Sequence, residues 1–214
     1  YDITSLLQPG LNVVGAVLAS GWYGDRRLLL QIHIDYADGT SGMVVTGRSG
    51  EGGTWWRVTQ SPIQHTGIYD GETYDARMEM PGWDTPEYDP HQFEQLNTWM
   101  VGMMVESPGG ELAAQTIDPI RVVDVLRAKS ISQPKPGVYV FDTGQNLSGW
   151  ARLSVFGERG TKVTLRFGEV LYPDGTLNQE NLRSAKATDT YILKGEGIET
   201  WEPSFTYHGF RYIQ

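Results

Sequence analysis

The chain contains 214 residues, of which 17 are Lys or Arg and 26 are Asp or Glu, and it has no cysteine. This length allows one large domain or two small ones, each with its own core. The lack of cysteine excludes disulfide frameworks, zinc-thiolate sites and cysteine nucleophiles. The formal charge of −9 argues against a nucleic-acid partner. No apolar run approaches the ~18 residues that cross a bilayer, so no membrane partner is expected.

The first half of the chain predicts short strands joined by turns. After a helical turn expected at Ile3–Leu7, apolar even positions alternate with polar ones over residues 28–36, which is the pattern of a half-buried strand. An Asp-Gly turn at residues 38–39 then leads into residues 42–46, so this segment predicts a β-hairpin. A second helical turn is expected at Glu94–Met100.

The second half shows the same alternation. In residues 160–167, Val163, Leu165 and Phe167 form one apolar face, and the row Ala151, Leu153 and Val155 matches it in the strand before. A turn is expected at residues 173–176, with further strands at residues 188–193 and 200–212. Many short strands without intervening amphipathic helices predict an all-β protein built of antiparallel β-sandwiches.

The charge distribution divides the chain into two modules. Residues 1–115 contain 5 basic and 15 acidic residues, a balance of −10, whereas residues 116–214 contain 12 and 11, a balance of +1. A turn-rich segment, residues 107–119, lies at the seam. We therefore expect two consecutive sandwich domains, at residues 1–115 and 116–214.

Carboxylates are most concentrated between residues 68 and 77. In a strand, Asp70 and Glu72 would share a face and Asp75 would point the other way, so the three do not form a ready cluster. Calcium would need six to eight oxygens, so nearby loops would have to complete its shell. The favoured interpretation is a turn and an edge strand whose carboxylates pair with Arg77, with Ca²⁺ as the alternative.

No motif of an autonomous enzyme is present. The chain lacks a Gly-x-Ser-x-Gly elbow, a phosphate-binding loop and a dinucleotide fingerprint, and no acid pair for glycoside cleavage is evident. No two of the four histidines have metal-ligand spacing, and each is interpreted as structural or surface: His33, His65, His91 and His208.

Aromatic side chains offer a binding function instead, because Trp and Tyr rings stack on sugars. Trp22, between glycines in Gly21-Trp22-Tyr23-Gly24, is the candidate platform, and its alternative is a buried plug of the sandwich. One of the adjacent Trp55 and Trp56 would point outward from a strand, as a platform or as a cover for a neighbouring module. Trp83 and Trp150 are interpreted as packing or domain-interface residues.

Seven segments in order resemble bacterial α-L-rhamnosidases. Three, in the first half, resemble the N-terminal β-sandwich of that family: residues 21–23, 68–77 and 81–84. Four resemble its next, concanavalin-like sandwich: residues 136–150, 168–177, 187–191 and 202–212. The resemblance implies two sandwiches, jelly-roll-like and then concanavalin-like, with a first module truncated at its start.

The resemblance also implies an activity for the longer protein. Family members release terminal α-L-rhamnose with inversion, using paired acidic residues in an (α/α) barrel that follows the sandwiches. That barrel is not in this sequence, so no catalytic residue is assigned here. The expected role is a non-catalytic accessory region whose partners are the catalytic domain and a rhamnose-containing glycan.

Some family members use the first module to bind rhamnose with calcium. By this resemblance the carbohydrate-binding candidates are Trp22, Asp70 and Glu72, with Ca²⁺ as the only cofactor implied. The family more often has Arg-Gly after the position of Tyr23, where this chain has Gly24-Asp25-Arg26, and this departure alters the loop beside the site.

Three functions stay open at this stage: an accessory region, a free-standing carbohydrate-binding module, and a scaffold without ligand. An incomplete first sandwich would expose strand edges and apolar faces, which predicts a dimer or a tendency to aggregate. The compartment is not readable, because any leader would lie outside the sequence.

Overall fold

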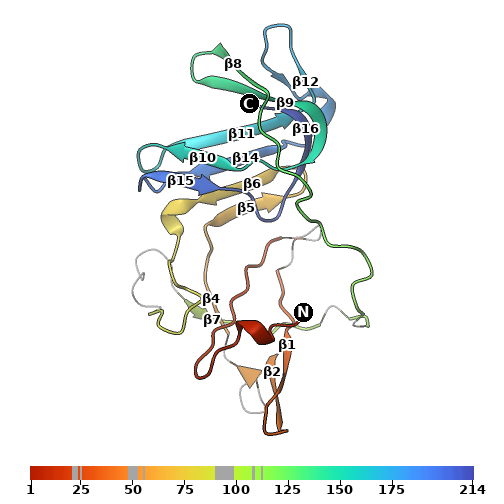
Figure 1. Ribbon diagram of the computed structural model, residues 1–214, viewed down its shortest axis with the longest axis vertical. Coiled ribbons are helices and arrows are strands. Elements are labelled where there is room, and N and C mark those ends of the chain that lie inside the picture. The colour runs from red at the N-terminus through yellow and green to blue at the C-terminus, as the bar shows by residue number, and fades with distance from the viewer. Residues whose placement is uncertain are drawn as a thin grey trace. The chain divides into compact units, whose positions relative to one another are not determined.

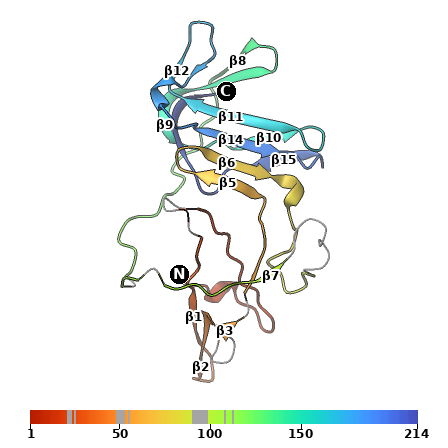
Figure 2. The same ribbon diagram turned by 180° about the vertical axis from the view of Figure 1, so that it is seen from behind.

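The computed structural model describes residues 1–20, 24, 26–47, 53–54, 56–89, 99–107, 109–111 and 113–214, with only the backbone of residues 53–54. Its chain forms two compact units (Figures 1 and 2). The first contains Tyr1–Gln64 and Asp75–Met104, and the second contains His65–Tyr74 and Val105–Gln214. Residues 65–74 are thus grouped with the second unit. The domain boundary expected between residues 115 and 116 stays a prediction.

Nearly all regular structure is β-structure, which confirms the predicted all-β fold. Within the described ranges the helical elements are 3-10 turns of three residues each: η1 (Thr4–Leu6), η2 (Ala76–Met78) and η3 (Glu180–Leu182). The first of these confirms the helical turn expected near the start of the chain. Of the turn expected at Glu94–Met100, residues 94–98 lie outside the described part, and Met100 belongs to a strand. None of the described helices could cross a membrane.

The first unit contains the predicted hairpin. Strands β1 (Gln31–Asp35) and β2 (Ser41–Thr46) are antiparallel, with Gln31 opposite Val45 and Asp35 opposite Ser41. The Asp38 carboxylate accepts hydrogen bonds from the backbone N–H and the hydroxyl of Thr40, at 2.9 and 2.6 Å. The turn is therefore closed by local side-chain contacts, as its sequence predicted.

The remaining strands of this unit are short. Strand β3 (Gly53–Thr54) pairs with β2 in parallel, and β4 (Arg57–Val58) pairs with β7 (Met100–Val101) in antiparallel orientation. Many apolar side chains after β7 are exposed, including Met103 at 89%.

The second unit is built on a seven-stranded sheet, in which β11, β14, β6 and β5 lie side by side (Figures 1 and 2). Its strands, in spatial order, are β5 (Ile63–Gly67), β6 (Gly71–Asp75), β14 (Thr188–Ile192), β11 (Lys162–Gly168), β16 (His208–Ile213), β9 (Val138–Gly149) and β8 (Ser130–Lys135). Two further pairs are β10 (Leu153–Phe156) with β15 (Ile198–Trp201), and β12 (Val170–Leu171) with β13 (Leu177–Asn178).

Aromatic rings form much of the core of this unit. Phe167 on β11 is fully buried and stacks on His208, with ring centroids 4.3 Å apart. The ring of Tyr191 on β14 lies 5.3 Å from Trp201 on β15 and 5.8 Å from Tyr74 on β6. These stacks join the large sheet to the β10–β15 pair, because the rings come from both.

The alternation predicted for residues 160–167 is confirmed. Leu165 and Phe167 are buried, Val163 is half-buried, and the intervening positions face the other side of β11. The strand before it, β10, pairs with β15 instead of β11. A row of alternating apolar residues therefore identified a strand correctly without revealing its partner, because the pairing joins residues 42 to 48 positions apart.

Candidate functional site

The predicted sugar platform, Trp22, lies outside the described residues, as does Trp55. Of the other tryptophans, Trp56 has a buried ring nitrogen without a hydrogen-bond partner among the described residues. Trp150 is half-buried and donates its ring N–H to Glu202 at 2.7 Å.

Asp70 lies in the turn of residues 68–70 that joins β5 to β6. Its carboxylate is 35% exposed, and it lies 3.4 Å from Lys186 Nζ and 3.7 Å from His65 Nε2. Tyr69 in the same turn is 59% exposed. The turn therefore presents an aromatic ring and a carboxylate to solvent.

Glu72 follows two residues later on β6, and its side chain is fully buried. The carboxylate accepts hydrogen bonds from the backbone N–H groups of Ser204 and Phe205, each at 3.2 Å. Burial raises the pKa of this carboxyl above its usual range, although the two amide donors oppose that effect. Its carboxylate thus connects β6 to the segment between β15 and β16.

A second buried carboxylate, Asp189 on β14, lies beside Glu72. Its Oδ1 atom accepts the backbone N–H of Glu72 at 2.9 Å and lies 3.1 Å from Nε2 of His208. Its Oδ2 atom has no hydrogen-bond partner among the described residues. Glu72, Asp189 and His208 therefore form a buried polar cluster on three strands. Sequence patterns missed it, because its members are far apart in the chain and each fits an ordinary strand.

Asp75 is paired with Arg77, as the favoured interpretation of residues 68–77 expected. The edge strand of that interpretation was wrong, because β6 lies inside the sheet between β5 and β14. The guanidinium donates to both carboxylate oxygens, at 2.8 and 2.7 Å, and Asp75 also accepts the backbone N–H of Arg77. The adjacent carboxylate raises the pKa of Arg77. In the described part of the chain, no three His, Asp or Glu side chains gather as ligands for a metal ion.

These features define an all-β protein, with a buried polar cluster on β6, β14 and β16 and a solvent-facing turn between β5 and β6. Sequence profiles of two known domains match it. The one described as the alpha-L-rhamnosidase N-terminal domain matches residues 1–124, and the bacterial alpha-L-rhamnosidase concanavalin-like domain matches residues 132–214. The chain belongs to the bacterial α-L-rhamnosidase family.

Known relatives agree with this assignment. An α-L-rhamnosidase of Streptomyces avermitilis is 44% identical over 228 residues, a match that covers all of this chain and 21% of the relative. The crystal structure of a Streptomyces avermitilis α-L-rhamnosidase in complex with L-rhamnose has a TM-score of 0.84 at 42% identity, over 100% of this chain and 21% of that one.

A third relative is the α-L-rhamnosidase from Dictyoglumus thermophilum, whose structure has a TM-score of 0.80 at 39% identity. That match covers 90% of this chain and 20% of the other. The chain therefore spans about a fifth of the length of these relatives.

Proposed function

We propose that this chain is a non-catalytic accessory region of an enzyme that hydrolyses terminal α-L-rhamnosides. The observation that carries the proposal is the match of both family domains, in order, along the chain. The α-L-rhamnosidases it resembles are four to five times longer, which leaves room for a separate catalytic domain as the partner of this region. We assign no catalytic residue to these 214 residues.

Rhamnose binding by this region, with Ca²⁺ as its cofactor, is part of the same proposal. Trp22 supplies the ring that packs on the sugar, and Asp70 supplies a carboxylate that can accept bonds from sugar hydroxyls. Support for Asp70 comes from its place in an exposed turn beside Tyr69. Glu72, the third predicted contact, is buried, so its proposed role is to hold the hairpin that carries Asp70.

Calorimetric titration of the 214-residue chain with L-rhamnose, with and without calcium, tests the binding. We expect saturable heat that is lost in Trp22→Ala and reduced in Asp70→Asn, whereas Trp83→Phe binds as the parent does. Absence of heat under all conditions would support a second function, a scaffold without ligand. Release of rhamnose from a chromogenic α-L-rhamnoside by this chain would overturn the non-catalytic role.

Self-association is also proposed. Large apolar side chains between residues 100 and 126 are exposed, among them Val123 at 96% and Ile117 at 76%. Exposed apolar surface of this kind favours association in water. Light scattering of the isolated chain should therefore give the mass of a dimer, and a monodisperse monomer would contradict this expectation.

A further inference from the structure

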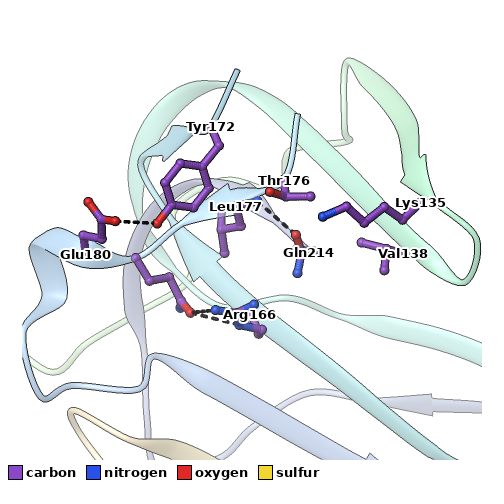
Figure 3. Close-up of a pocket in the computed structure, with 9 residues that line it drawn as sticks. Lys135, Val138, Arg166, Tyr172, Thr176, Leu177, Glu180 and Gln214 are labelled. Atoms are coloured by element: carbon purple, nitrogen blue, oxygen red, sulfur yellow. Dashed lines mark hydrogen bonds between the residues drawn. The ribbon is translucent and has the colours of Figure 1, made fainter. Parts of the chain in front are cut away.

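The second unit contains an open pocket that no sequence motif indicated (Figure 3). Its volume is about 480 Å³, which is within the range of pockets that hold small ligands. It lies where the β12–β13 hairpin and η3 meet the ends of β11 and β16. Leu177 and Val138 supply its apolar part, and polar side chains supply the rest.

Arg166 is the central polar group of the pocket. It lies on the face of β11 opposite Phe167, directly across from Gln214, with which it exchanges two backbone hydrogen bonds of 2.8 Å. Its Nε and Nη2 groups both donate to Oε1 of Gln179, at 2.9 and 2.5 Å. Gln179 in turn donates its side-chain NH₂ group to the carbonyl oxygen of Phe167 at 2.9 Å. The guanidinium is thus fixed before any ligand arrives.

The other polar groups are also positioned by neighbours. Gln214 accepts the backbone N–H of Leu177 through Oε1 at 2.9 Å, which leaves its NH₂ group to donate to a ligand. Tyr172, which is 37% exposed, donates its hydroxyl to Glu180 at 2.9 Å. Figure 3 shows this pair on one side of the pocket and Lys135 on the other. Groups held in this way bind with a smaller entropy cost.

The charge of the pocket differs from that of the whole chain. Its lining contains two cations, Lys135 and Arg166, and one carboxylate, Glu180, although the whole chain has a formal net charge of −9. Lys135 lies 3.2 Å from Asp174, whereas among the described residues no carboxylate lies within ion-pair distance of Arg166. A half-buried guanidinium with a neutral amide as its side-chain partner favours an anionic ligand.

We propose that this pocket binds a pyranose that carries a carboxylate, which is a uronic acid unit of a glycan. Arg166 pairs with the carboxylate, the ring of Tyr172 packs on the sugar, and Gln214 and Glu180 bond its hydroxyl groups. The inference rests on the proposed function in one respect, because the acidic sugar would belong to the same rhamnose-containing glycan. It places a second recognition site in the concanavalin-like domain.

The test is a titration of the 214-residue chain with sodium D-glucuronate and with D-glucose, which differ at the acid group. We expect glucuronate to bind at least about tenfold more tightly, since a charge-assisted bond to arginine contributes about that factor. Raising NaCl from about 50 to about 500 mM should weaken glucuronate binding through screening. Equal affinity for the two sugars, or no binding of glucuronate, would overturn the proposal.

Substitutions in the pocket test whether glucuronate binds there. Arg166→Gln should weaken glucuronate binding at least about tenfold. Lys162→Gln, which removes an exposed cation from the same strand outside the pocket, should leave binding unchanged. Tyr172→Ala, in the exposed hairpin, is a second variant that spares the sheet and should weaken binding of both sugars. Full binding by folded Arg166→Gln and Tyr172→Ala proteins would overturn the assignment.

Two controls separate this proposal from its alternatives. Sodium sulfate that displaces glucuronate at equal concentration would reveal a simple anion site and overturn sugar recognition. L-rhamnose binding that depends on Trp22 reports on the proposed function, whereas glucuronate binding that depends on Arg166 reports on this pocket. Loss of one signal with retention of the other therefore identifies which proposal failed.

Discussion

The carboxylate of Asp189 and the imidazole of His208 lie 3.1 Å apart in the interior of the second unit, with side-chain exposures of 0% and 2%. The same carboxylate oxygen accepts the backbone N–H of Glu72. Asp189 thus joins its own strand to β6 and β16. Removal of one partner from such a buried contact leaves the others without compensation.

Asp189→Ala should therefore lower the free energy of unfolding by about 3 kcal/mol, because it leaves the Glu72 N–H and the His208 ring in the core without this hydrogen-bond partner. Urea denaturation at neutral pH measures this loss. Asp189→Asn keeps an oxygen acceptor and should lose less. An alanine variant within about 0.5 kcal/mol of the parent would show that the contact has no net effect.

Glu72 makes stability depend on pH. Its folded-state pKa is raised, chiefly by burial, so the folded protein binds this proton more tightly than the unfolded chain does. The contribution to stability is present at low pH and is lost as pH rises from the ordinary pKa through the folded one. The stability of Glu72→Gln relative to the parent should therefore increase from about pH 4 to pH 7. Urea denaturation across that range measures it, and a constant difference would contradict the pKa direction.

Gly71 is required by close packing of the hairpin. Its φ of +103° disfavours other residues, and a Cβ there would lie 2.6 Å from the carbonyl carbon of Thr188 and 2.7 Å from Asp189 Oδ1. Gly71→Ala should destabilise the protein by about 3 kcal/mol or more, since strain and a backbone clash combine.

The matched control is Gly39→Ala, whose φ is +85° but whose Cβ would meet nothing within 4 Å. It should cost about 1 kcal/mol from strain alone. Thermal or urea unfolding compares the two variants. Equal losses would show that backbone conformation, and not the contact with Thr188 and Asp189, makes glycine necessary at position 71.

Trp150 controls the titration of Glu202. Its ring N–H bond is the largest cause of the lowered pKa of that carboxyl, followed in the same direction by Arg152. Trp150→Phe should raise the Glu202 pKa toward its ordinary value, as carboxyl NMR shifts would show. Because a lowered folded pKa adds stability that is lost on acidification, the variant should also lose less stability than the parent as pH falls. An unchanged Glu202 titration would refute this role.

Local features of the fold were predictable, because neighbouring residues supply the contacts that form them. The hairpin turn depends on Asp38 and Thr40, and the Asp75–Arg77 pair spans two positions. Alternation predicted the face of β11 that carries Phe167. The motifs of residues 136–150 and 202–212 predicted the family, which the profiles confirm.

The functional candidates depended on contacts that no local pattern contains. Glu72 was a carbohydrate-binding candidate by family resemblance, yet its carboxylate is buried and accepts hydrogen bonds from amides 132 and 133 positions away. The pocket around Arg166 needs Gln179 and Gln214, which approach only when β16 and the β12–β13 hairpin are in place.

The all-β class, several of the strands and turns, and the family were readable from the amino-acid sequence, since periodicity, turn chemistry and ordered motifs are local properties. Strand pairing, the burial of particular carboxylates and the partners of Arg166 became visible only in the folded chain. Burial and hydrogen bonding at Glu72, Asp189 and Arg166 arise from contacts across the sheet. An alternating pattern along one strand does not specify which other strand will supply those contacts.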